Sequence, residues 1–398
     1  MGYLFFILTR FLVILSKPLA IYGLIYLGLK DLADIYASTI AVFAVCLAFL
    51  NCEAHRYFYP KILNNTNDIQ DKKLYFSILS SHSLMVFLPI FFIITLSINL
   101  GVKIALLQIL IVLLDKVADE VLRLNIYKHE FIRWSFLSYF RVIIPASTLL
   151  IVQSVDKFFL FWASSLFVGL ILQFINQKNI FKSCIQFFQS ISAHGYFKKL
   201  KDGHYLYIIF AIFSSLVLVY ERFFISSIYF EQIAFFSIAF AVAFILEPFI
   251  DTIFYTKLRQ AWCKSAALTF KSLKYVLLVC SVYLAMVLQS IYFEELYSQY
   301  VVDYKNIIKY ILPLSFTAII YVLTYPFTQI AYWHSSSKNI TSVEMASLIG
   351  ILPSLVWIFI SSNTVGFVWM FLIFFILRAL LYLRLYYMIT KKLVIKNS

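Results

Sequence analysis

Long apolar segments separated by short polar joints organise the whole chain. A helix needs about 20 predominantly apolar residues to cross a bilayer, and twelve segments of the sequence meet this requirement. We therefore predict an all-α, polytopic membrane protein. The predicted spans cover residues 6–28, 34–55, 75–98, 102–123, 134–153, 157–176, 205–228, 232–253, 273–293, 306–330, 341–361 and 366–388.

The longest polar connection divides these spans into two sets of six. Residues 29–37 and 229–237 favour two similar halves, because in both an apolar arm ends, an acidic residue marks the turn and a new arm begins. Since each half has six spans, both halves have the same orientation in the membrane. This predicts a symmetry axis along the membrane normal and a cleft between the halves. The predicted parts are an N-terminal six-helix bundle (1–176), a cytoplasmic linker (177–204) and a C-terminal six-helix bundle (205–398).

The composition excludes a soluble protein. Hydrophobic residues make up 63% of the chain and charged residues 13%, and the mean hydropathy is +0.89. A soluble domain has about 45–50% apolar and about 25% charged residues. The strands of a porin alternate apolar and polar residues over about ten positions, and this chain instead has continuous apolar runs.

The distribution of basic residues predicts the topology. The net charge of +14 could indicate a nucleic-acid partner, but the lysines and arginines lie in short loops between apolar segments. With the N-terminus inside, the outer loops hold Lys30 and Lys305, and the other loop cations fall on the inner side. The positive-inside rule then places both termini in the cytoplasm. Arg10 and Lys17 interrupt the first apolar run and no cleavage site follows it, so we expect a retained first span.

Cysteine and histidine give no indication of a metal or a cofactor. The five cysteines have no C-x-x-C spacing, and the six histidines form no H-E-x-x-H motif. We therefore expect no metal site, no cofactor and no disulfide.

Cations inside the predicted spans are the candidate substrate-binding residues. A charge at the bilayer centre costs about 2.5–3.5 kcal/mol, so each should face a partner or a wet cavity. Lys17 and Arg378 lie in mid-span with no acid on their own helices. Cations that converge on one cleft would bind a polyanion, and phosphate suits arginine and lysine best. The alternative is that carbonyls and hydroxyls hold them in a packed core. The candidates are Lys17, Lys116, Arg141, Arg222 and Arg378.

Acids inside the spans are the candidate coupling residues. Glu247 and Asp251 stand four positions apart beside Pro248, and Glu221 adjoins Arg222 in the first arm of a predicted hairpin over 216–244. A buried carboxyl group can exchange a proton near neutral pH. Glu221 or Glu247 is thus a candidate proton-responsive group, with Asp251 as a neighbour, and a purely structural ion pair is the alternative.

Four charged residues near the end of the predicted span 102–123 are spaced to neutralise one another. Lys116 and Glu120 stand four positions apart, as do Asp119 and Arg123. Residues at this spacing lie on the same face of a helix. We therefore expect two ion pairs within one helix.

Several short passages resemble one family of transporters. The twelve spans and the cationic interior look like those of the Wzx-type O-antigen flippases of the multidrug/oligosaccharidyl-lipid/polysaccharide exporter superfamily. The resemblance extends over nearly the whole chain. The passages that carry it are Glu221-Arg222…Glu231…Phe235-Phe236-Ser237, Pro18-Leu19…Gly28-Leu29-Lys30-Asp31…Asp34-Ile35-Tyr36 and Ala54-His55-Arg56.

The resemblance implies a transporter rather than an enzyme. Its substrate would be an undecaprenyl-pyrophosphate-linked oligosaccharide, such as the O-antigen unit of lipopolysaccharide, moved across the bacterial inner membrane by alternating access. The cationic cleft would bind the pyrophosphate and the sugar, while the lipid tail stays in the bilayer. Membrane lipids, a polysaccharide polymerase and a chain-length regulator are the further partners that the family implies.

Three other classes remain open. An O-antigen polymerase would have a long outer loop with basic residues, whereas the longest predicted loop lies inside. A drug/cation antiporter of the same superfamily would have an acidic cavity in its first half, whereas the first span offers Lys17. A scaffold protein would not need cations in mid-span. Reporter fusions across 177–204 would distinguish the polymerase from the transporters.

Overall fold

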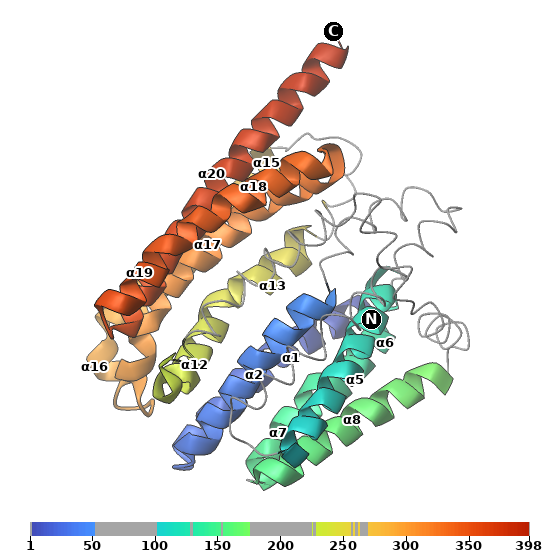
Figure 1. Ribbon diagram of the computed structural model, residues 1–398, viewed down its shortest axis with the longest axis vertical. Coiled ribbons are helices and arrows are strands. Elements are labelled where there is room, and N and C mark those ends of the chain that lie inside the picture. Colours follow the sequence, from blue (N-terminus) through green and yellow to red (C-terminus); the bar gives the residue numbers. More distant parts are fainter. Residues whose placement is uncertain are drawn as a thin grey trace. The chain divides into compact units, whose positions relative to one another are not determined.

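Helices make up all of the regular structure that is described. The computed structural model describes residues 2–51, 102–127, 130–152, 154–175, 225, 228–255, 258, 262 and 270–397, and every regular element among them is helical (Figure 1). Eight of the described helices have the length and apolar composition needed to cross a membrane. They indicate a multi-pass membrane protein. These helices are Tyr3–Tyr26, Phe131–Val152, Val155–Ile175, Phe230–Tyr255, Leu273–Tyr292, Tyr304–His334, Lys338–Ile360 and Thr364–Lys391.

Eight of the predicted spans overlap these eight helices. The predicted spans 34–55 and 102–123 overlap two further helices, Lys30–Asn51 and Val102–Tyr127, which are not among the eight. Each predicted range in the described part of the chain overlaps a helix. The range 75–98, the linker 177–204 and all but two residues of 205–228 lie outside the described residues. The count of twelve spans and the two six-helix bundles therefore stay predictions.

The described residues up to Ala234 form one compact unit, and those from Phe235 onward form a second. In the first unit, Phe6 of the first helix packs edge-on against Trp134, with ring centroids 4.7 Å apart. Gly23 lies so close to Leu150 that an added Cβ would approach its side chain to 2.8 Å. The first unit contains α1 (Gly2–Tyr26), α2 (Lys30–Asn51), α5 (Val102–Tyr127), α6 (Phe131–Ser138), η1 (Tyr139–Ile143), α7 (Ile144–Val152), α8 (Val155–Ile175) and η3 (Phe230–Gln232).

The second unit is built around two long helices, α17 and α20, which pack along each other. Its core includes Tyr255, Trp262, Val322, Ile330 and Tyr382, all of them buried. Its elements are α12 (Ile233–Phe244), whose first two residues still belong to the first unit, α13 (Leu246–Ile250), η4 (Asp251–Tyr255), α15 (Phe270–Tyr292), α16 (Glu294–Tyr297), α17 (Tyr304–His334), α18 (Ser337–Leu348), η5 (Ile349–Ile351), α19 (Leu352–Ile360) and α20 (Thr364–Asn397).

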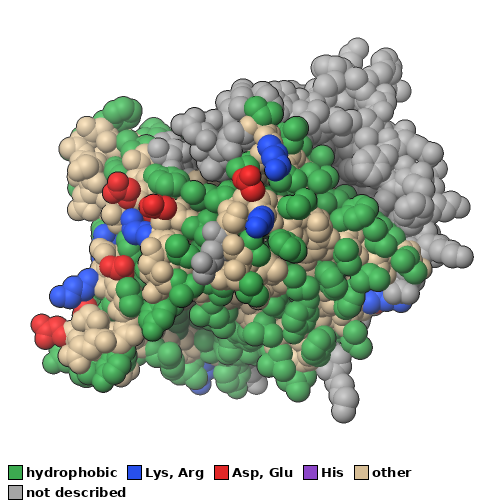
Figure 2. All heavy atoms as spheres, turned by 90° about the horizontal axis from the view of Figure 1, so that it is seen from below, with side chains coloured by type: hydrophobic (Ala, Val, Ile, Leu, Met, Phe, Trp, Pro, Cys, Tyr) green, Lys and Arg blue, Asp and Glu red, His purple; other side chains and the backbone are tan. Residues whose placement is uncertain are grey.

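Large apolar side chains cover much of the outer surface. Phe359 of α19 is 90% exposed, and Leu278 and Met286 of α15 are also exposed. Hydrophobic side chains dominate the described part of the face in Figure 2, with few charged groups among them. A surface of this kind would be unfavourable in water. It is the surface that lipid chains solvate, in agreement with the lengths of the helices.

The helix that carries Arg141 has a π-helical turn, η1, in its middle. The N–H of Ile144 bonds to the carbonyl of Tyr139 instead of that of Phe140. The next residue, Pro145, has no N–H, so the helix itself leaves the Phe140 carbonyl without a donor. The hydroxyl of Ser165 on α8 donates to this carbonyl at 2.6 Å. A neighbouring helix thus supplies the missing bond, as the apolar interior of a membrane protein requires.

A second proline distortion is compensated in the same way. Pro326 within α17 removes the N–H that would bond to the carbonyl of Val322 four residues earlier. The hydroxyl of Tyr255 at the end of η4 donates to that carbonyl at 2.7 Å. The backbone of α17 at this point is therefore joined to η4 by a side-chain hydrogen bond within the second unit.

Candidate functional site

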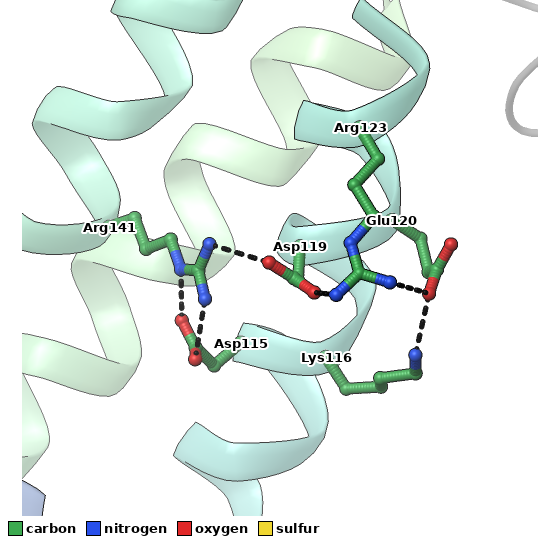
Figure 3. A network of polar contacts seen from close by, with 6 residues as sticks. All are labelled: Asp115, Lys116, Asp119, Glu120, Arg123 and Arg141. Carbon is green, nitrogen blue, oxygen red and sulfur yellow. Dashed lines mark hydrogen bonds and ion pairs between the residues drawn. The ribbon is translucent and has the colours of Figure 1, made fainter. Parts of the chain in front are cut away.

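The most highly charged site in the described part of the chain lies between α5 and η1. We call it the α5 network: Asp115, Lys116, Asp119, Glu120 and Arg123 of α5 with Arg141 of η1 (Figure 3). Three carboxylates and three cations alternate through it, so its formal charges balance. Its side chains are mostly buried; that of Arg141, for example, is 19% exposed.

Arg141 joins the two elements through a forked set of hydrogen bonds. Its Nε donates to Oδ1 of Asp115 at 2.5 Å and its Nη2 to Oδ2 of the same carboxylate at 3.0 Å. Its Nη1 donates to Oδ1 of Asp119 at 3.1 Å. The bidentate contact with Asp115 is the strong geometry for a guanidinium and a carboxylate.

The two ion pairs predicted within one helix are confirmed. Lys116 Nζ lies 2.6 Å from Glu120 Oε1, and Arg123 Nη2 lies 2.7 Å from Asp119 Oδ2. Arg123 Nη1 also lies 3.6 Å from Glu120 Oε1, so the two pairs form one chain of contacts. Removing a single member of a buried network leaves the charge of its partner uncompensated. This lowers the stability more than replacing both members by apolar residues does.

A second buried ion pair lies in the second unit and joins α18 to α20. Arg378 donates to Glu344 through Nη2 at 2.8 Å and through Nε at 3.2 Å. The hydroxyl of Tyr382 donates to the same carboxylate at 2.5 Å, and that of Tyr332 on α17 at 3.4 Å. Both charged side chains are 6% exposed. One carboxylate thus receives donors from two other helices.

This pair is one of the two arrangements that the sequence left open for Arg378. The cation meets an acid on another helix, and the premise of an uncompensated charge does not hold for it or for Arg141. Glu344 was missing from the sequence-based acids, although it is the one acid in the predicted span 341–361. Matching this acid with Arg378, the mid-span cation of the next predicted span, would have predicted the pair.

The other predicted site residues are spread over both units. Lys17 lies on α1, half-buried, directly before the buried Pro18. Glu247 is half-buried in α13, and Asp251 is buried at the start of η4, one turn later. Glu221 and Arg222 lie outside the described residues. A common cleft for Lys17, Arg141, Arg222 and Arg378 therefore stays a prediction.

The two passages that look alike in sequence meet in the first unit. Asp34 of the first passage accepts a hydrogen bond from the backbone N–H of Ala234 of the second, at 3.2 Å. The same carboxylate lies 3.4 Å from Lys30. Ala234 is in the first turn of α12, where helical N–H groups have no carbonyl partner within the helix. Asp34 therefore acts as a cap supplied from far away in the sequence.

The donor set of these sites suits charge pairing and anion exchange. Among the residues that the structure describes, no group of three histidine, cysteine or acidic side chains could hold a metal ion. A guanidinium held by carboxylates can exchange its carboxylate partner for another anion with two acceptor oxygens, such as a phosphate, without leaving its helix.

Comparisons of the chain with protein-family models, with curated proteins and with solved structures found no match.

Proposed function

We propose that the protein is a flippase for an undecaprenyl-pyrophosphate-linked oligosaccharide, the O-antigen unit or a similar surface-polysaccharide unit, in the bacterial inner membrane. Two features support the proposal. The passages around Pro18 and Glu221 resemble Wzx-type flippases, and eight described helices are long and apolar enough to span a membrane. In this proposal both termini lie in the cytoplasm, and no covalent chemistry takes place.

The observation that carries the proposal is the forked contact of Arg141 with Asp115 inside a predicted span. Ionisable residues in membrane helices commonly mark the path of a charged substrate. A guanidinium that binds a carboxylate through two parallel hydrogen bonds presents the geometry that a phosphate group also needs. In the resting protein Asp115 and Asp119 neutralise Arg141. On substrate binding the pyrophosphate takes the place of a carboxylate.

The remaining residues take roles around this exchange. Lys116 adds a compact charge next to Arg141, and Lys17, Arg222 and Arg378 hold the pyrophosphate during transit through an alternating-access cycle. A proton gradient drives the cycle through the coupling acids Glu221, Glu247 and Asp251. A polysaccharide polymerase and a chain-length regulator would act on the unit after translocation.

One observation favours a drug/cation antiporter as a second candidate. The acids Asp115, Asp119 and Glu120 gather in the first unit, where such an antiporter needs negative charge. The same network holds as many cations as acids, so its net charge alone does not favour a cationic substrate. A binding measurement with both kinds of ligand distinguishes the two candidates.

The test is the thermal unfolding of the purified full-length protein with lipids that differ only in the headgroup. Undecaprenyl pyrophosphate should raise the unfolding midpoint, and undecaprenol, with the same tail and no charge, should not. Arg141→Lys should lose this shift because lysine has no fork. Arg133→Ala, which removes an exposed partner of Glu130, should keep it. Equal shifts with both lipids would contradict the flippase, and shifts with organic cations alone would favour the antiporter.

A further inference from the structure

Three hydroxyl groups, one on α1 and two on α6, are buried and have no hydrogen-bond partner among the described residues: Thr9, Ser135 and Ser138. Their exposed fractions are 0%, 0% and 2%. A buried hydroxyl without a partner costs about 1–3 kcal/mol, so such groups normally bond to protein or to ordered water. We call these three residues the polar seam.

Thr9 and Ser138 lie at one level of the α1–α6 contact. Phe6 packs against Trp134 and Gly23 lies against Leu150, so α1 runs parallel to the helix formed by α6, η1 and α7. Thr9 follows Phe6 by one turn, and Ser138 follows Trp134 by one turn. Residues three or four apart share a helix face, which places Thr9 and Ser138 next to each other at the contact.

These hydroxyls also differ from others in the same protein. A serine or threonine in a membrane helix usually donates to the carbonyl three or four residues earlier. Thr39 does so to Ile35 at 2.8 Å, and Ser164 does so to Leu160 at 2.8 Å. The polar seam makes no such bond. The three hydroxyls therefore lack even the bond to their own helix that other hydroxyls of the protein make.

The seam adjoins the α5 network. Ser138 stands three residues before Arg141, on the same stripe of the helix. Asn125, near the end of α5, adds a fourth buried side chain whose two polar atoms have no partner. Its backbone carbonyl accepts from the N–H of Glu130, just before α6 begins. Unpaired polar groups thus extend from the turn between α5 and α6 to the vicinity of Arg141.

We propose that the polar seam binds ordered water and gives the α5 network access to the aqueous phase. The hydroxyls can both donate and accept, which is what bridging water requires. Water at Ser138 would hydrate the Arg141 guanidinium and lower the cost of separating it from Asp115. The inference concerns hydration and does not depend on which solute the protein carries.

The first test is the reactivity of cysteines placed in the seam. In a full-length variant without the five natural cysteines, Thr9→Cys and Ser138→Cys should react with a small water-soluble thiosulfonate at least about tenfold faster than Leu137→Cys, because the reaction needs a hydrated thiolate. Leu137 is a matched control, since it lies on the same helix, is fully buried and approaches Gly169 of α8. Equal rates at the three positions would overturn the proposal.

The second test uses the sign of a stability change. The combined variant Thr9→Val, Ser135→Ala, Ser138→Ala removes hydrogen-bond partners from the water if the seam is hydrated, and should lower the unfolding midpoint. If the seam is dry, the same variant removes three unsatisfied groups and should raise the midpoint. A raised or unchanged midpoint overturns the proposal.

Discussion

Arg378 and Glu344, which stand on different helices and are almost completely buried, face each other with nitrogen–oxygen distances of 2.8 and 3.2 Å. Arg378→Ala should lower the free energy of unfolding by about 3–5 kcal/mol, because it leaves the Glu344 carboxylate buried without a cation. Unfolding of the purified protein in mixed micelles measures this change.

Two further variants give that measurement its controls. The double variant Arg378→Met, Glu344→Leu should recover most of the lost stability, because it removes both charges. Arg384→Ala, which removes an exposed arginine from the same helix, should change the stability little. If Arg378→Ala is no worse than Arg384→Ala, the pair does not stabilise the second unit.

The contribution to stability of the hydrogen bond from Tyr255 to the Val322 carbonyl should depend on Pro326. Tyr255→Phe keeps the ring, which stacks on Tyr325 with centroids 5.2 Å apart, and removes only the hydroxyl. It should cost about 0.5–1.5 kcal/mol of unfolding free energy. In a Pro326→Ala background, which returns an N–H to α17, the same change should cost clearly less. Equal costs in the two backgrounds would show that the hydroxyl does not replace the missing backbone donor.

Asp115 should compete with the substrate for Arg141. Asp115→Asn weakens the contact that occupies the guanidinium, so the affinity for undecaprenyl pyrophosphate should rise by about tenfold, or about 1.4 kcal/mol. Transport should fall, because tighter binding of the substrate before translocation does not lower the free-energy barrier to translocation. Titration of the lipid against Asp115→Asn and wild-type protein tests this, and unchanged affinity would mean that Arg141 does not contact the headgroup.

The proposed coupling acid gives a prediction about pH. If Glu247 takes up and releases the driving proton, Glu247→Gln should flatten the dependence of transport on pH between about pH 6 and pH 8. Glu295→Gln, at an exposed acid of α16, should keep the wild-type profile. A wild-type profile in Glu247→Gln, and in the corresponding Glu221→Gln variant, would contradict the coupling proposal.

Apolar run length was sufficient to predict the long helices in the described part of the chain. A segment such as 306–330 is read directly from its hydrophobic residues, and the structure has α17 there, with several residues more at its ends. Spacing along one helix was also sufficient for Lys116 and Glu120, since residues four apart must lie on one face. These are local properties, and local properties are what a single sequence records.

Contacts between helices could not be read in the same way. The sequence places neither Glu344 opposite Arg378 nor Asp115 opposite Arg141, because these pairs depend on the rotation of packed helices. The π-helical turn at Arg141 changes that rotation further. The backbone bond from Ala234 to Asp34, two hundred positions apart, has no local signature at all.

Flipping of the lipid-linked oligosaccharide itself tests the central claim most directly. The purified protein is placed in vesicles that carry a labelled undecaprenyl-pyrophosphate oligosaccharide on both leaflets, and an enzyme added outside cleaves the exposed sugar. Wild-type protein should expose nearly all of the sugar to the enzyme with time. Arg141→Ala vesicles and protein-free vesicles should stop at about half, because the inner leaflet stays protected. Protection of half the sugar in wild-type vesicles would contradict the flippase.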